Sequence, residues 1–312
     1  MRTLRQRLAA AALLLACAAA GAESPPLKLT DDAGHEVALP HAAQRIVSLA
    51  PHLTEMVYAA GAGSQLVAVG KYSDFPPEAL SKPVISDAFA VNYEELTTLK
   101  PDLVLVWGSG TPERIKSKLR TLGFPVYEIE IRSVPDLVDT LRSIGRLAGT
   151  EGVAQARAQA IARDWVALKA TYAGRKPVRV FFQLWDAPLM TLNGQHLISN
   201  AIAACGGSNV FGELSTLTAT VSWEVAVQRD PELVMTAGSA SEPAKPGRWA
   251  DFPQVSATKH GQFGRIEGEL IARSGPRFVD GARELCVAID RARQGLPQLV
   301  IPGAKAASAA HN

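Results

Sequence analysis

The chain has 312 residues, of which 47% are hydrophobic and 20% are charged, and its formal net charge is +2. This length and apolar content allow a large buried core and exceed what one compact domain usually holds, so we expect two lobes. The near-neutral charge excludes a protein that binds nucleic acid through a broad basic surface.

Residues 1–22 have the pattern of a secretory signal peptide. Arg2, Arg5 and Arg7 give a positive start, an apolar run too short to span a bilayer follows, and small residues at 20–22 offer a cleavage site. Cleavage would leave a charge near −1, because three of the 32 basic residues and none of the 30 acidic ones lie there. The run LLAC, which ends at Cys17, also resembles a bacterial lipobox. The two alternatives predict a free periplasmic protein or one anchored to the membrane by a lipid on Cys17.

We assign residues 23–149 to an N-terminal lobe. The segment DDAGHEVALP predicts a hairpin with its bend at Gly34. Then RIVSLA (45–50) and LVAVG (66–70) predict strands, and HLTEMVYAAGAG (52–63) between them indicates a helix that ends in glycines. Strand, helix and strand in this order favour a parallel sheet.

The segment NYEELTTLKPDLVLV (92–106) has a counterpart in SWEVAVQRDPELVMT (222–236). In both, a small polar residue is followed by glutamate, then by proline, an acidic residue, leucine and valine. A polar N-cap, an acidic first turn and a proline stop predict a short helix followed by a buried strand. After the first copy, TPERIKSKLRTLG and PVYEIE predict a further helix and strand.

Residues 150–174 predict one long helix between the lobes. No proline lies between Thr150 and Tyr172, and apolar residues recur at intervals of three and four. The helix would be about 34 Å long. Because no proline or glycine lies between Val153 and Ala173, we expect a rigid spacer.

The strand pattern restarts at VRVFFQLW (178–185), so residues 175–293 form a C-terminal lobe, and 294–312 are expected to be a flexible tail. The predicted fold class is therefore α/β. Two βα (Rossmann-like) lobes are joined by one long backbone helix, with a ligand cleft between the lobes.

Cys205 and Cys286 are the cysteines outside the signal region. In an oxidising compartment the simplest outcome is a disulfide, which would stabilise the fold by roughly 4 kcal/mol on the chain-entropy model. The alternative is two buried free thiols.

Four aromatic residues stand near strand ends: Tyr72, Phe89, Trp107 and Trp185. Each alone could be an ordinary aromatic that packs at the edge of a sheet. Together, at the carboxyl ends of parallel strands, they predict a cleft for a large, flat, partly apolar ligand.

From about Arg45 to Ala292 the chain resembles the periplasmic substrate-binding proteins of ABC importers for cobalamin, within the wider group that handles iron-siderophores and haem. The resemblance rests on six segments in order: RIVSLAPHLTEMVYAAGA, YSDFPPEA, NYEELTTLKPDLVLVW, CGGSNVF, VSWE and RSGPRF. It implies a monomeric binding protein, not an enzyme, that captures cobalamin or a related corrinoid. Its partner would be a permease dimer with its cytoplasmic ATPase, and the corrinoid would be cargo, with no cofactor. The alternative is a binding protein for an iron-siderophore or haem.

The resemblance also implies roles for individual residues. Glu94 and Glu224 would dock into arginine pockets on the permease, although both could be first-turn glutamates favoured only by the helix dipole. Cys205 and Cys286 would form a disulfide within the C-terminal lobe. Tyr72 and Trp107 match ligand-contacting aromatics of the family. Ala88 and Ala219 stand where the best-known members carry tryptophan, and Phe89 and Trp185 are expected to compensate.

Two other classes of function find less support in the sequence. The motifs of serine hydrolases, zinc proteases, P-loop enzymes and dinucleotide-binding enzymes are absent. Capture of a bare metal ion needs three or four convergent ligands, whereas the six histidines are spread along the chain, so we predict no metal site. If the ligand were haem, His52 or His260 could bind its iron.

Overall fold

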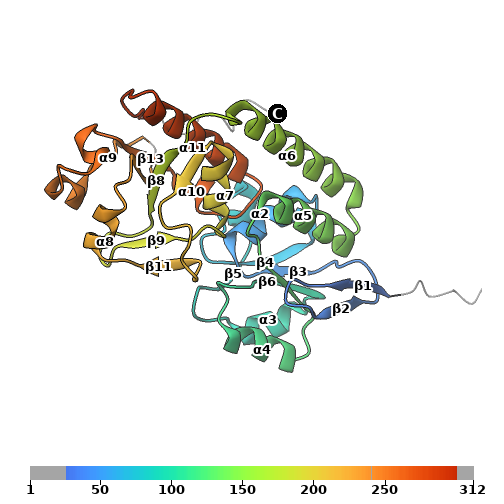
Figure 1. Ribbon diagram of the computed structural model, residues 1–312. Coiled ribbons are helices and arrows are strands. Elements are labelled where there is room, and N and C mark those ends of the chain that lie inside the picture. Colours follow the sequence, from blue (N-terminus) through green and yellow to red (C-terminus); the bar gives the residue numbers. More distant parts are fainter. Residues whose placement is uncertain (1–25, 240, 301–312) are drawn as a thin grey trace, which may run out of the picture.

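The computed structural model describes residues 26–239 and 241–300 (Figure 1). The predicted signal peptide, Cys17 and residues 301–312 of the predicted tail lie outside the described residues. In the described part of the chain, no helix has the length and apolar character needed to cross a membrane.

The N-terminal lobe is built on a parallel sheet with the strand order β5-β4-β3-β6-β7. Its strands are β3 (Ile46–Ser48), β4 (Leu66–Gly70), β5 (Val84–Ser86), β6 (Leu103–Trp107) and β7 (Val126–Ile129). Its helices are α2 (Pro51–Ala59), α3 (Tyr93–Leu99), α4 (Glu113–Thr121) and α5 (Val134–Ala148), with 3-10 turns at Gly63–Gln65 and Pro77–Ser81. The predicted hairpin pairs β1 (Leu27–Thr30) with β2 (Glu36–Leu39), and Gly34 has the positive φ of 87° that its bend needs.

The C-terminal lobe has a second parallel sheet, with the order β10-β8-β12-β13. Its strands are β8 (Val178–Gln183), β10 (Gly207–Asn209), β12 (Leu233–Gly238) and β13 (Phe263–Glu267), and β9 (Met190–Leu192) pairs separately with β11 (Thr218–Thr220). The helices are α7 (Leu197–Ala204), α8 (Trp223–Gln228), α9 (Ser256–Lys259), α10 (Gly268–Ile271) and α11 (Phe278–Arg293), with a 3-10 turn at Gly247–Asp251.

The repeated segments form equivalent units in the two sheets. Each consists of a short helix, α3 or α8, followed by a strand, β6 or β12, that is paired on both sides. The side chain of Asn92 accepts a hydrogen bond from the backbone of Glu95 (3.1 Å), and that of Ser222 accepts one from Val225 (3.3 Å), so both act as the predicted N-caps. The order β4-β3-β6-β7 corresponds to β10-β8-β12-β13, which confirms the α/β fold with two related sheets.

The acidic residue that follows the proline of each repeated segment has a structural role that was not predicted. Asp102 accepts the backbone N–H of Arg45 at 2.9 Å, and Glu232 accepts that of Arg179 at 2.9 Å. The Arg45 side chain donates to the carbonyl of Leu99, the last residue of α3, at 2.7 Å, and the Arg179 side chain donates to that of Asp230, just after α8, at 3.0 Å. Each acid therefore holds the start of the neighbouring strand, where a backbone donor would otherwise lack a partner.

The long helix α6 (Glu151–Tyr172) begins and ends close to the predicted bounds. Figure 1 shows α6, in green, running past α5 at one end and towards α11 at the other. Its buried residues include Ala154, Ile161 and Trp165, and they belong to one apolar core that also contains residues of both sheets. The two lobes therefore share a core along this helix.

Two details differ from the prediction. Helix α5 was not among the predicted elements, although its signals are present: Ser133 caps its start, and Gly149, with a φ of 71°, ends it. The strand predicted to reach Trp185 ends at Gln183, because the chain turns there into the hairpin that leads to β9.

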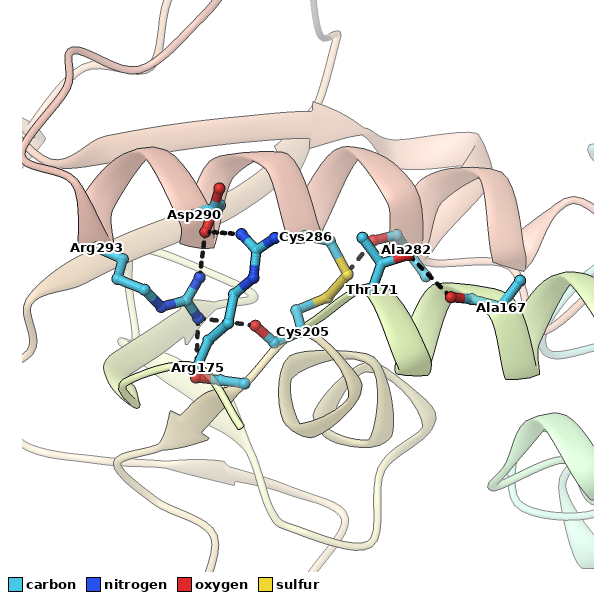
Figure 2. Close-up of a disulfide and its surroundings, with 9 residues drawn as sticks. Ala167, Thr171, Arg175, Cys205, Ala282, Cys286, Asp290 and Arg293 are labelled. Atoms are coloured by element: carbon cyan, nitrogen blue, oxygen red, sulfur yellow. Dashed lines mark hydrogen bonds and ion pairs between the residues drawn. A yellow bond between two sulfur atoms is a disulfide. The ribbon is translucent and has the colours of Figure 1, made fainter. Parts of the chain in front are cut away.

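The predicted disulfide between Cys205 and Cys286 is present and ties the end of α7 to α11 (Figure 2). Figure 2 also shows Asp290 of α11 between Arg175 and Arg293, and Arg293 donates a further hydrogen bond to the carbonyl of Cys205 (2.9 Å). The segment just before β8, through Arg175, and the end of α7, through Cys205, are thus both attached to α11.

Candidate functional site

The carboxyl ends of the parallel strands define one edge of each sheet. In the N-terminal sheet, the chain adds β4 and β5 on one side of β3 and then β6 and β7 on the other side. In the C-terminal sheet, it likewise adds β10 on one side of β8 and β12 and β13 on the other, so the strand order reverses between β3 and β6 and between β8 and β12. In such sheets a crevice opens outside the carboxyl ends of the two central strands, where ligands bind. The candidate site is therefore expected at the ends of β3 and β6 and at those of β8 and β12.

A cavity of about 140 Å³, which we call the N-terminal hollow, lies at this edge of the N-terminal sheet. Its walls come from the segments after β3, β4 and β5, from the end of β6 and the loop that follows it, and from α4. They are formed by Leu49, Ala50, Pro51, Lys71, Tyr72, Asp87, Ala88, Trp107, Gly110, Thr111, Pro112 and Ile115. Two predicted aromatics, Tyr72 and Trp107, thus share one apolar cavity, and Ala88 leaves room there. Ala219 lies on β11, outside the residues that line the hollow.

Trp107 is the last residue of β6, and its side chain is 38% exposed. The indole meets the edge of the buried His52 ring, with centroids 5.1 Å apart and planes at 83°. A methyl group on Gly110 would lie 1.8 Å from the indole, so only glycine leaves space for the ring in this position. Trp107 is therefore held in place from two sides.

His52, which packs against this tryptophan, is uncharged at neutral pH. Burial lowers the pKa of His52 to about 4, and the positive charge of Arg273 contributes in the same direction. Its side chain is 6% exposed, so the imidazole is not presented to the cleft as an iron ligand. His260 follows α9 and precedes β13, which places it at the amino edge of the sheet, away from the candidate cleft.

The other three predicted aromatics are strongly exposed: Tyr72 by 69%, Phe89 by 74% and Trp185 by 64%. Tyr72 follows β4 and Phe89 follows β5, whereas Trp185 begins the hairpin after β8. With Trp107, they are the only exposed Phe, Tyr or Trp side chains in residues 26–239 and 241–300. Because aromatic side chains are normally buried, four exposed ones near the carboxyl ends of strands favour the ligand interpretation over ordinary edge packing.

Glu94 and Glu224 are both exposed in the first turns of α3 and α8. The pKa of Glu224 is lowered by a hydrogen bond from its own backbone N–H and, to a smaller extent, by one from Ser222. Each glutamate directly follows an aromatic residue whose ring is in contact with a basic side chain. Lys118 Nζ lies 4.0 Å from the ring centroid of Tyr93, and the guanidinium of Arg248 lies 5.1 Å from that of Trp223. Both helices precede central strands, so their first turns lie on the cleft side of the two sheets.

One group in the described part of the chain has ligand atoms close enough to share a metal ion: Asp31, His35 and Glu128. Glu128 is already paired with Lys116 at 2.6 Å and with Arg120 at 3.0 Å. None of these residues lines the N-terminal hollow. The group is adequately explained as a buried ion-pair network, because its carboxylates are neutralised by protein cations.

Residues 46–266 match the sequence profile of the periplasmic binding protein family. The chain belongs to this family. A vitamin B12-binding protein of Vibrio cholerae is 34% identical over 251 residues, which cover 80% of this chain and 90% of that protein. One from Salmonella typhimurium is 32% identical over 252 residues and covers 80% and 92%.

Solved structures of other periplasmic binding proteins share the fold. The crystal structure of the periplasmic vitamin B12 binding protein of Vibrio cholerae matches with a TM-score of 0.75 and 33% identity, over 81% of this chain and 98% of that one. The periplasmic heme-binding protein HutB of the same species matches with a TM-score of 0.67 at 23% identity, over 78% and 98%, which supports the fold alone. The family that the chain belongs to is one of binding proteins.

Some residues at the site were missed by the sequence analysis. Lys71 and Asp87 line the hollow beside the predicted aromatics. Glu55 and the two arginines of RSGPRF, Arg273 and Arg277, meet between the lobes. All three lie in segments on which the resemblance rests, but nothing in a linear pattern shows that residues 55 and 277 are neighbours.

Proposed function

We propose that this protein is an extracytoplasmic binding protein that captures cobalamin or a related corrinoid between its lobes and delivers it to the permease dimer of an ABC importer, which acts with a cytoplasmic ATPase. The observation that carries the proposal is the set of four exposed aromatics, Tyr72, Phe89, Trp107 and Trp185, near the carboxyl ends of the strands. The relatives from Vibrio cholerae and Salmonella typhimurium described above, both named vitamin B12-binding proteins, supply the ligand class.

The chemistry of the site suits a large, flat ligand. Aromatic faces gain most from a partner with a broad apolar surface, and a macrocycle provides one. The N-terminal hollow is apolar, and His52 behind it is uncharged at neutral pH. A cavity of about 140 Å³ accommodates only part of such a ligand, so the rest would lie between the lobes against Trp185.

The decisive experiment is a calorimetric titration of the protein without residues 1–22 with cyanocobalamin, run beside haem and a ferric siderophore. We expect one molecule of cyanocobalamin per chain, bound about tenfold more weakly by Trp107→Ala, since an aromatic contact is worth up to about 1.5 kcal/mol and about 1.4 kcal/mol is a factor of ten. Val166→Ala, a truncation of an exposed residue on α6, is the control. Binding of haem or the siderophore alone would replace the ligand, and binding of none of the three would overturn the proposed function.

Glu94 and Glu224 are proposed as the anchors for the permease, one on each lobe. Two carboxylates on equivalent helices suit a two-fold partner with arginines, because charge-assisted pairs fix orientation. The double variant Glu94→Lys, Glu224→Lys should keep ligand affinity within about twofold but abolish stimulation of the reconstituted importer's ATPase. Glu151→Lys, which alters another exposed first-turn glutamate, is the control for a simple effect on the helix dipole. Full stimulation by the double variant would contradict the docking assignment.

Residues 1–22 are proposed to direct export and then to be removed. The mass of the exported protein distinguishes cleavage after Ala22 from lipidation of Cys17, because only the second product carries acyl chains. A monomeric mature protein is part of the same proposal and can be checked by light scattering.

A further inference from the structure

A buried carboxylate joins the two lobes. Glu55 lies on α2 of the N-terminal lobe, and its side chain is 2% exposed. Arg277, just before α11, donates Nε to Oε2 at 2.9 Å and Nη2 to Oε1 at 2.7 Å. Arg273 adds a third hydrogen bond to Oε1 at 3.2 Å. A paired arginine–carboxylate contact of this kind fixes both position and orientation.

The same two arginines also hold the loop after β4. Arg273 donates to Asp74 Oδ1 at 2.6 Å, and the guanidinium of Arg277 lies 3.8 Å from the ring centroid of Phe75. The hydrogen bond from Arg273 lowers the pKa of the Asp74 carboxyl, which keeps the pair charged. We call Glu55, Asp74, Phe75, Arg273 and Arg277 the interlobe clasp.

This loop carries Tyr72, one of the proposed ligand aromatics. Tyr72 has a positive φ of 67°, which is uncommon for a residue with a large side chain. Its carbonyl accepts the backbone N–H of Asp74 at 3.1 Å, so the two residues belong to one tight turn. On the other side, Ser73 is hydrogen-bonded to Thr54 of α2 at 3.0 Å. The turn is thus held by its own lobe through Ser73 and by the opposite lobe through Asp74 and Phe75.

We propose that Arg273 and Arg277 are positioning residues for ligand capture, which fix Tyr72 from the opposite lobe before the ligand arrives. This inference rests on the proposed function. A loop that is ordered in advance does not lose conformational freedom on binding, so affinity should depend on the residues that order the loop. It also follows that the lobes cannot separate without breaking a desolvated ion pair, which is strongly destabilising.

The first test needs no ligand. Asp74→Asn removes the negative charge that pairs with Arg273, and Asp164→Asn is the matched control, because it removes the carboxylate of α6 that pairs with Arg283 of α11. Hydrogen exchange of the backbone amides of residues 72–75 should be about tenfold faster in Asp74→Asn and unchanged in Asp164→Asn. Equal exchange in Asp74→Asn and the unaltered protein would overturn the inference.

The second test measures the affinity for cyanocobalamin in a double-mutant cycle. Asp74→Asn should weaken binding on the order of tenfold when Tyr72 is present, and by less than about twofold in the Tyr72→Ala background. Equal losses in both backgrounds would show that Asp74 does not act through Tyr72 and would refute the proposal. If the unaltered protein binds no cyanocobalamin, the proposed ligand fails, while the exchange experiment still decides whether the clasp holds the loop.

Discussion

The buried His52 should make the fold lose stability in mildly acidic solution. Its pKa is about 4 in the folded protein and would return to its usual 6.5 in the unfolded chain. Between these values the unfolded state binds a proton that the folded state does not, so stability falls as the pH falls from 6.5 to about 4. A difference of this size corresponds to about 3 kcal/mol, because one pH unit is worth about 1.4 kcal/mol and the side chain is almost fully buried.

The assay compares the unaltered protein with His52→Gln, which has similar length and no titration in this range. Urea unfolding of both proteins, followed by circular dichroism from pH 7 to pH 4, gives the free energy of unfolding at each pH. We expect the unaltered protein to lose about 3 kcal/mol more than the variant across this range. The variant's lower stability at pH 7 does not matter, because only the change with pH is compared.

Other groups with altered pKa values do not obscure the result. Burial also lowers the pKa of His196, and hydrogen bonds from Arg175 and Arg293 lower that of Asp290, but both groups are present in both proteins. Their contributions therefore cancel in the difference. Parallel curves of unfolding free energy against pH for the two proteins would show that His52 does not titrate with a lowered pKa. They would refute the description of His52 as an uncharged side chain packed against Trp107.

Two further predictions concern the disulfide and the position of Trp107. Replacing Cys205 and Cys286 by alanine should lower the free energy of unfolding by about 4 kcal/mol, because an 81-residue separation is no longer constrained in the unfolded chain; a loss below 1 kcal/mol in urea unfolding would contradict this. Gly110→Ala should displace the indole of Trp107 and weaken ligand binding at least about tenfold, whereas Gly152→Ala, at an open position in α6, should leave the affinity unchanged. Equal affinities for Gly110→Ala and Gly152→Ala would show that the indole position does not matter.

The fold could be predicted well where local signals and the burial pattern agree. The caps and proline stops of the repeated segment predicted α3, β6, α8 and β12, because those signals act within a few residues. The absence of proline and the spacing of apolar residues predicted α6. Signals of the same kind, Ser133 at the start and Gly149 at the end, mark α5, so this helix too is predictable from local residues.

The site could be predicted only in part. The positions of Tyr72, Phe89, Trp107 and Trp185 near strand ends follow from the parallel-sheet pattern, and their exposure agrees with it. The interlobe clasp could not be predicted, because Glu55 and Arg277 are distant in sequence and only the packing of α2 near the start of α11 brings them together. The role of Asp102 and Glu232 also needed coordinates, since each bonds to a strand that precedes it by some 50 residues or more.

The disulfide sets an order in which the two halves of the chain can mature. All five strands of the N-terminal sheet lie before residue 130, so that sheet can be complete before Cys205 has been synthesised. Cys205, by contrast, must wait for Cys286, which follows it by 81 residues. Because α11 also supplies Asp290 and Arg293 around the disulfide, the covalent closure of the C-terminal lobe requires that α11 has docked.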